Sequence, residues 1–408
     1  MTDAIRITRT TTKKDKPRDK DLSFGTVFTD HMFVASFQEE KGWYDPRVEP
    51  YAPLPLDPAT AVLHYGQSLF EGLKAFRGKD GTIRMFRPQK HVERLNRTAH
   101  RMSIPPLDPE LILRSWTTLV DVDRDWVPSS VGTSLYIRPT IIASEPFLGV
   151  RPAKEYLYYV ILSPVGPYYP EGLAPTKIKV IDNYVRAVAG GLGEAKTAAN
   201  YAASLYAAEE AKHEGFTQVL WLDGVHHKYI EEVGTSNIML KIDDEVVTPP
   251  LAGTILAGVT RDSALALMRA WGMHVSERPI TIDEVVAAAR DGRLQEVWAT
   301  GTAAVISPVG ELAYKGERLV VNGGRIGETA QKLYDTIVAI QYGNAPDTHR
   351  WTVVVGGPDM APHPPQRSSR PGEAVARLDD ASAVRGPDRA PHDPQRSEAP
   401  RPSRGTPR

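Results

Sequence analysis

The sequence predicts an α/β protein with mixed sheets and two domains. A chain of 408 residues is too long for one small core, so two domains are the natural expectation. Runs of β-branched and aromatic residues alternate with segments of helical spacing along most of the chain. A stretch rich in proline, tyrosine and glycine at 166–172 interrupts this alternation and marks a domain boundary.

The expected organisation has four parts. Residues 1–21 are basic, carry several aspartates and lack an apolar stretch, which argues against a targeting peptide and predicts a mobile arm. A smaller N-terminal α/β domain is expected at 22–170. A larger C-terminal domain is expected at 171–351, and it begins with an interdomain loop at 171–176. The remaining residues, 352–408, are rich in proline and arginine and poor in large apolar residues, which predicts a disordered tail.

The tail contains a degenerate internal repeat, in which residues 357–368 recur at 386–397. A copied segment can be a binding motif, and it can equally result from neutral duplication in a disordered region. The sequence assigns no chemistry to it.

In the smaller domain, β-branched and aromatic runs predict strands, and prolines mark helix starts. A Gly-Lys-Asp-Gly sequence at 78–81 predicts a hairpin. Pro88 suits the first position of a helix, where an N–H group would have no partner within the helix. We expect strands at 26–38, 73–77, 82–86, 134–143 and 156–162, and helices at 88–102 and 109–120.

In the larger domain, three glycines at 190–193 precede an alanine-rich segment with helical spacing. Asp223 and Gly224 separate two strand-like runs, as in a hairpin. We expect strands at 177–181, 218–222, 228–232, 238–242, 245–247 and 295–305, and helices at 202–214, 259–270, 282–290 and 328–341.

Charge and composition exclude several classes of protein. The 49 basic and 50 acidic residues give a net charge of −1, so no overall field favours nucleic acid or an anionic membrane. Cysteine is absent, which excludes disulfides and thiolate chemistry, and the 11 histidines lack metal-ligand spacing. No apolar run approaches the ~20 residues of a membrane helix. We expect a cytoplasmic protein without a metal site.

Lys196 is the first candidate for chemistry. It stands between the glycine-rich stretch at 190–193 and the alanine-rich helix. Small, largely uncharged neighbours would allow a tight pocket, in which desolvation lowers the pKa of the amine from ~10.4. An amine of this kind can form a Schiff base. A solvated lysine at a helix start is the alternative, and spacing alone does not decide between them.

Two segments could bind an anion. Val259 and Thr260 follow Gly258 at the start of a helix, where free N–H groups and the helix dipole suit a phosphate. Thr302 and Ala303 follow a strand and offer a hydroxyl among small residues. The second segment fits a phosphate or carboxylate site and a simple tight turn equally well.

Several charged residues have two interpretations. Glu232 and Thr235 flank a glycine turn, and a buried Glu232 would need a cationic partner such as a protonated pyridine nitrogen; a surface turn is the alternative. Arg138, near Tyr136 in an apolar strand, indicates either an ion pair or an anion site. Arg94 is one of several basic residues on its helix, which also fits a solvated face. The residues alone therefore indicate a two-domain α/β protein with a candidate phosphate site.

A series of motifs in one order resembles the branched-chain amino acid aminotransferases, which are pyridoxal-phosphate enzymes of fold type IV. The similarity runs from about residue 24 to residue 342. The motifs include Phe-Glu-Gly-Leu-Lys-Ala-Phe at 70–76, Glu-Ala-Lys-Thr-Ala-Ala-Asn-Tyr at 194–201 and Glu-Val-Gly-Thr at 232–235. The others lie at 28–32, 136–139, 218–223, 247–250, 301–303 and 340–343.

The resemblance implies a cofactor site at the junction of the two domains. Lys196 would form the Schiff base with pyridoxal 5′-phosphate and later move a proton between the substrate Cα and the cofactor. Glu232 would pair with the pyridine nitrogen, and Tyr201 would lie near the phenolic oxygen. The other residues implied to contact the cofactor, several of them through its phosphate, are Arg94, Thr235, Val259, Thr260 and Thr302.

The resemblance also implies an aromatic wall around an aliphatic substrate side chain. Tyr65, Phe70 and Tyr168 match this wall, and Phe28 joins them. Thr302 and Ala303 would contact the substrate as well.

Tyr136 and Arg138 match residues that reach the site of a neighbouring subunit, which implies a homodimer. Arg138 would bind the distal carboxylate of glutamate. The implied reaction is ping-pong amino transfer between L-leucine, L-isoleucine or L-valine and 2-oxoglutarate, giving branched 2-oxo acids and L-glutamate. Mammalian members carry a redox-active Cys-x-x-Cys after the Gly-Thr-Ala motif, whereas this chain has Ala304 and Ser307, so thiol control is not available.

Three other activities remain as alternatives. D-amino-acid aminotransferases and aminodeoxychorismate lyases of the same fold share the lysine and the glutamate but not the flanking motifs. A protein of a different class would bind the cofactor without catalysis and act as a scaffold through its tail.

Overall fold

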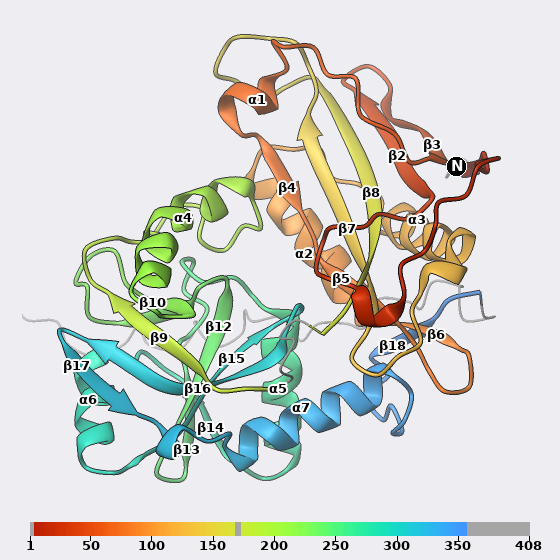
Figure 1. Ribbon diagram of the computed structural model, residues 1–408. Coiled ribbons are helices and arrows are strands. Elements are labelled where there is room, and N and C mark those ends of the chain that lie inside the picture. Colours follow the sequence, from red (N-terminus) through yellow and green to blue (C-terminus); the bar gives the residue numbers. More distant parts are fainter. Residues whose placement is uncertain (1–3, 168–172, 357–408) are drawn as a thin grey trace, which may run out of the picture. The chain divides into compact units, whose positions relative to one another are not determined.

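Two sheets of nine strands each organise the described residues, 4–167 and 173–356, of the computed structural model (Figure 1). The first sheet is formed by the N-terminal strands together with one strand from the end of the described chain. The second sheet is formed by the strands in between. Within the described ranges, no helix is both long and apolar enough to cross a membrane.

The first sheet has the strand order β1-β3-β2-β8-β7-β5-β6-β18, with β4 beside β7. Its pairings are antiparallel except for that of β1 with β3. Along β8, buried and half-buried residues alternate from residue 155 to 162, as expected for a strand with one face on a core. The strands are β1 (Arg6–Ile7), β2 (His31–Gln38), β3 (Gly42–Pro50), β4 (Ser68–Phe70), β5 (Leu73–Arg77), β6 (Ile83–Phe86), β7 (Ser134–Ala143), β8 (Glu155–Val165) and β18 (Thr352–Val354).

The helices of this half are α1 (Ala61–Tyr65), α2 (Pro88–Arg101) and α3 (Pro109–Val122), with short 3₁₀ turns at Asp19–Asp21 and Arg124–Trp126. Both α2 and α3 begin with proline, as the sequence predicts for α2. The Asp108 side chain caps α3 by accepting a hydrogen bond from the Glu110 N–H. The apolar faces of these two helices bury Leu95 and Trp116 in a common core with the sheet.

The second sheet has the order β11-β10-β9-β16-β15-β12-β13-β14, with β17 beside β16. It is mixed, because β9 is parallel to both β10 and β16, and β13 is parallel to β14. The strands are β9 (Thr176–Ile181), β10 (Gln218–Leu222), β11 (Ile230–Val233), β12 (Ser236–Ile242), β13 (Glu245–Thr248), β14 (His274–Glu277), β15 (Leu294–Gly301), β16 (Val305–Tyr314) and β17 (Glu317–Val320).

Four helices accompany the second sheet: α4 (Ala198–His213), α5 (Val259–Ala270), α6 (Ile282–Arg290) and α7 (Glu328–Gln341), with a 3₁₀ turn at Asn322–Gly324. The expected helix starts at 259, 282 and 328 agree with these bounds. Phe76 and Phe86 of the first sheet share a hydrophobic cluster with Leu333 of α7 and Leu265 of α5. All the described residues belong to one compact unit, and the division into domains at 22–170 and 171–351 remains a prediction.

Both ends of the described chain differ from expectation. The predicted mobile arm at 1–21 is tied to the first sheet over its described part: β1 pairs with β3, and the Lys14 N–H donates to Asp30 Oδ1 at 2.9 Å. The predicted tail at 352–408 is wrong for its first residues, which are ordered. Residues 352–354 form β18 beside β6 (Figure 1), and Val355 is buried. In both cases backbone hydrogen bonds to an existing strand order a segment whose own composition would not.

Candidate active site

Lys196 lies in the turn before α4, next to a phenol. Its Nζ donates a hydrogen bond to the Tyr201 hydroxyl at 2.8 Å. The backbone is fixed from the other half of the fold: the Lys196 N–H donates to Thr98 Oγ1, and its carbonyl accepts from the Phe70 N–H at 3.0 Å. Thr197 Oγ1 donates to the Ser68 carbonyl. The lysine is therefore held between α4 of one half and β4 and α2 of the other.

The glycine-rich stretch before Lys196 permits this placement. Gly190 has φ +77°, which favours glycine, and a Cβ on Gly193 would lie 2.3 Å from the Thr254 carbonyl oxygen. The Asn200 side-chain amide donates to the Leu192 and Ala195 carbonyls at 2.7 and 2.8 Å. The close backbone approach that the glycines predict is therefore present.

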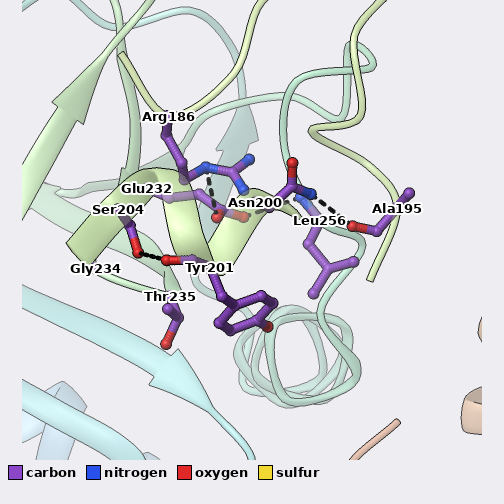
Figure 2. A pocket seen from close by; sticks show the side chains of 9 residues that line it. All are labelled: Arg186, Ala195, Asn200, Tyr201, Ser204, Glu232, Gly234, Thr235 and Leu256. Atoms are coloured by element: carbon purple, nitrogen blue, oxygen red, sulfur yellow. Dashed lines mark hydrogen bonds and ion pairs between the residues drawn. The ribbon is translucent and has the colours of Figure 1, made fainter. Parts of the chain in front are cut away.

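Glu232 is buried in a pocket that Tyr201 also lines (Figure 2). Its Oε1 accepts from the Leu256 N–H at 2.9 Å and from Asn237 Nδ2 at 3.1 Å, and its Oε2 lies 3.2 Å from Arg186 Nε. Burial raises the pKa of Glu232, and the Arg186 charge opposes that shift. The residues that line the pocket are Arg186, Ala195, Asn200, Tyr201, Ser204, Glu232, Gly234, Thr235 and Leu256.

Arg94 is a buried cation and not part of a solvated helix face. Its Nε and Nη2 donate to the two carboxylate oxygens of Glu71 at 2.7 and 2.8 Å. His91 Nδ1 lies 2.8 Å from Glu71 Oε2. Burial alone would raise the pKa of Glu71, but the Arg94 guanidinium holds that pKa well below its usual range.

The segment 256–260 connects these two charged groups. Leu256 donates its N–H to Glu232, and the next carbonyl, that of Ala257, accepts from Arg94 Nη1 at 3.1 Å. Val259 and Thr260 then open α5, and no side chain caps the N-terminus of this helix. Consecutive residues before α5 therefore bond to Glu232 and to Arg94, and the first turn of α5 follows them directly.

One wall candidate, Phe70, and two other predicted substrate-site residues, Tyr136 and Arg138, come together. The Phe70 ring centroid lies 4.8 Å from that of Tyr201 and 4.9 Å from Lys196 Nζ. The Arg138 guanidinium lies 4.7 Å from the Phe70 ring centroid, and its Nη2 donates to the Tyr136 hydroxyl at 3.0 Å. Phe70 therefore contacts both Lys196 and Arg138 of its own chain, and the reach of Tyr136 and Arg138 into the site of a neighbouring subunit remains a prediction.

Thr302 and Ala303 occupy the turn between β15 and β16. A Cβ on Gly301 would lie 2.9 Å from Ser236 Oγ, so the turn abuts the residue that follows Thr235 of the pocket. The Ala303 carbonyl accepts a hydrogen bond from Lys74 Nζ at 2.7 Å.

Two of the predicted wall residues lie in other surroundings. The Phe28 ring stacks on Tyr51, with a centroid separation of 5.4 Å. Tyr65, at the end of α1, is 45% exposed. Tyr168 lies outside the described residues. The contributions of these three residues to a substrate wall remain predictions.

The sequence did not single out Glu71, Arg186 or Lys74. Glu71 and Lys74 stand in the 70–76 motif, and charged residues in such an apolar stretch were the available signal. No comparable signal marks Arg186, whose contact with Glu232 depends on the fold.

Comparison with known proteins places the chain in a family. The family model for amino-transferase class IV matches residues 68–312. A branched-chain-amino-acid aminotransferase 2 of Bacillus subtilis is 57% identical over 351 residues, which cover 86% of this chain and 97% of that protein. The chain therefore belongs to the class IV aminotransferases. Within that class it belongs to the branched-chain-amino-acid aminotransferases.

Solved structures give the same fold. A branched-chain aminotransferase from Thermoproteus uzoniensis with norvaline aligns with a TM-score of 0.67 at 24% identity, covering 80% of this chain and 99% of that one. A branched-chain amino acid aminotransferase from T.th. with pyridoxamine 5′-phosphate aligns with a TM-score of 0.66 at 25% identity, covering 79% and 98%. The predicted fold type IV architecture is confirmed.

Proposed function

We propose that this protein transfers the amino group between L-leucine, L-isoleucine or L-valine and 2-oxoglutarate, with pyridoxal 5′-phosphate as cofactor. The relative from Bacillus subtilis bears the name of this activity at 57% identity. The observation that carries the proposal is the grouping of an amine, a buried carboxylate and a buried guanidinium from distant parts of the chain. The amine is that of Lys196, which lies beside Tyr201. The carboxylate is that of Glu232, and the guanidinium is that of Arg94.

The donor set fits this cofactor. The N-terminus of α5, with Val259 and Thr260, would offer N–H groups and a positive dipole end to a phosphate, and Arg94, whose charge Glu71 balances, would offer guanidinium donors beside it. Glu232 is a buried carboxylate with a raised pKa, and a protonated ring nitrogen would give it a second cationic partner besides Arg186. Thr302 and Thr235 would complete the contacts. The related structure from T.th. contains the amine form of the cofactor.

Each of these residues would have a separate role in the proposed reaction. When bound, the cofactor supplies the electron sink that transamination requires. Lys196 Nζ would be the base that takes a proton from the substrate Cα and returns it to the cofactor carbon on the other side of the amino nitrogen, and the Tyr201 hydroxyl at 2.8 Å would orient that amine. Glu232 would favour a protonated ring nitrogen, and a protonated ring withdraws electrons more strongly.

Arg138 is the candidate residue for binding the second carboxylate of 2-oxoglutarate. Its Nε is buried and has no hydrogen-bond partner among the described residues, although Nη2 donates to Tyr136. A guanidinium with an unsatisfied donor suits a second carboxylate. Phe70 beside it offers the apolar contact for the branched side chains, so one pocket would serve both substrate types.

We also propose a homodimer. Helix α4 exposes Leu205 and Tyr206 at 66% and 62%, and α1 exposes Leu63 at 59%. Large apolar side chains this exposed favour an interface with a second copy. Sedimentation of the purified protein tests this proposal, and a monomer at micromolar concentration would contradict it. A cytoplasmic location remains a prediction.

The substrate class is tested by amino-acceptor assays on the wild-type protein loaded with pyridoxal 5′-phosphate. The expected result is formation of L-glutamate from 2-oxoglutarate with L-leucine, L-isoleucine and L-valine, and none with D-alanine. Conversion of D-alanine or aminodeoxychorismate in place of L-leucine would assign one of the alternative activities. Cofactor binding without turnover of any of them would favour the scaffold alternative.

A further inference from the structure

Lys74 is a buried cation that the proposed chemistry does not use. It lies on β5 and is 8% exposed, and its Nζ donates to the Ala303 carbonyl at 2.7 Å. Among the described residues, no carboxylate lies within ion-pair distance of it. An ammonium has three donors, and burial lowers the pKa of Lys74 to about 8. The chain therefore maintains an unbalanced positive charge at this position.

The hydrogen bond of Lys74 joins the two halves of the fold. Lys74 belongs to the first sheet, whereas Ala303 lies in the β15–β16 turn of the second sheet. Val305, directly after this turn, has φ +63°, an unfavourable conformation for a β-branched residue. In a trans peptide the carbonyl and the following N–H point in opposite directions, so a fixed Ala303 carbonyl also fixes the direction of the Ala304 N–H.

The surroundings of Lys74 are suited to an anion. A cavity of about 60 Å³ is lined by Lys74, Ser134, Ala303 and Gln341, among others. Among the described residues, Ser134 Oγ and Gln341 Oε1 in this lining are buried without a hydrogen-bond partner, and of these two the hydroxyl can donate to an anion. Lys74 also faces Tyr136 across the β5–β7 pair, and Tyr136 contacts Arg138. Lys74 thus belongs to the same face of the sheet as the residues proposed to meet the substrate.

We propose that Lys74 is a positioning residue for the substrate carboxylate. It holds the 302–304 turn through the Ala303 carbonyl and places its positive charge behind the turn, so that an anionic ligand is favoured over a neutral one. Every substrate of the proposed reaction carries a carboxylate, and the inference therefore rests on the proposed function. A lysine with a purely structural role would stabilise the turn without favouring a charged ligand.

The test compares an acid with its neutral isostere. The dissociation constants of 4-methylpentanoate and 4-methylpentanamide are measured on cofactor-loaded wild type, Lys74→Met and Lys74→Arg. We expect Lys74→Met to bind the acid about 10- to 100-fold more weakly while binding of the amide changes little, so that the preference for the acid is lost. Lys74→Arg should restore part of the preference. The KM for L-leucine should rise in Lys74→Met more than kcat falls.

Control measurements show whether the role of Lys74 or the proposed function itself is wrong. Lys90→Met removes an exposed lysine from α2 and should change the dissociation constant of neither the acid nor the amide. Equal weakening of acid and amide in Lys74→Met, or an unchanged preference for the acid, overturns the positioning role. If Lys74→Met does not fold, Lys74→Gln is compared with Lys74→Arg by the same criterion. A wild type that neither binds the acid nor transaminates L-leucine contradicts the proposed function itself, whereas a normal wild type with an unchanged variant contradicts only the role of Lys74.

Discussion

Replacement of Glu71 by glutamine should destabilise the protein strongly, because Glu71 balances the charge of Arg94. The Glu71 side chain is fully buried and Arg94 is 4% exposed. Glu71 accepts from Arg94 Nε, Arg94 Nη2, His91 Nδ1 and the Gly72 N–H at 2.7, 2.8, 2.8 and 3.1 Å. In Glu71→Gln the guanidinium remains buried without a counter-charge.

Removal of one partner of a buried ion pair costs about 3–5 kcal/mol. Glutamine keeps one acceptor oxygen for Arg94, so we expect a loss near the lower limit, about 3 kcal/mol. The free energy of unfolding is measured in urea at pH 7 without added cofactor. The control is Glu93→Gln on α2, the helix that carries Arg94, where the pair of Glu93 with Lys90 is about half exposed. That change should cost less than about 1 kcal/mol.

The pH dependence gives a second check. Because the pKa of Glu71 is lower in the folded than in the unfolded protein, its stabilising effect is present above the unfolded value of ~4.3. The effect is lost as the pH falls from there toward the folded value. The difference between wild type and Glu71→Gln should therefore shrink below about pH 4. A difference under about 1 kcal/mol at pH 7, equal to that of Glu93→Gln, would refute the pairing argument.

Three further changes have definite expected outcomes. Glu232→Gln should reduce kcat for L-leucine about 100- to 1000-fold, because the ring nitrogen loses its anionic partner; a near-normal kcat would exclude that role. Gly193→Ala should destabilise the protein by about 1–3 kcal/mol, because the new Cβ would meet the Thr254 backbone; wild-type urea stability would contradict the close approach. Deletion of residues 357–408 should leave turnover of L-leucine unchanged, and loss of activity would give the repeated tail a role in catalysis.

Local patterns predicted some regular elements well but missed others, among them the nine residues of β3 and the ten residues of β16. Helix α7 was expected at 328–341 and spans Glu328–Gln341, because its apolar residues repeat at helical spacing within one segment. Strand β1 has only two residues and β18 has three, and neither carries a pattern of its own. Pairing with β3 and β6 orders these strands, and such partners cannot be read from a local window.

The candidate site likewise contains residues that motifs predicted and contacts that only the fold reveals. The roles of Lys196, Tyr201 and Glu232 were implied by the resemblance of their motifs to those of the family, whereas residue type and spacing alone did not decide them. Periodicity alone left Lys196 as a possible surface residue. The pairing of Arg186 with Glu232 spans 46 positions of sequence and depends on how β11 meets the loop before α4. Contacts of this kind arise from tertiary packing and leave no local signal.

The most direct test of the central claim is the absorbance spectrum of purified protein before and after addition of L-leucine, for wild type and Lys196→Ala. The account predicts a bound-cofactor band in the wild type that shifts on addition of L-leucine. In Lys196→Ala it predicts no covalent cofactor band and no turnover. A wild type that binds no pyridoxal 5′-phosphate, or a Lys196→Ala variant with normal turnover, would contradict the assignment of Lys196 as the catalytic amine.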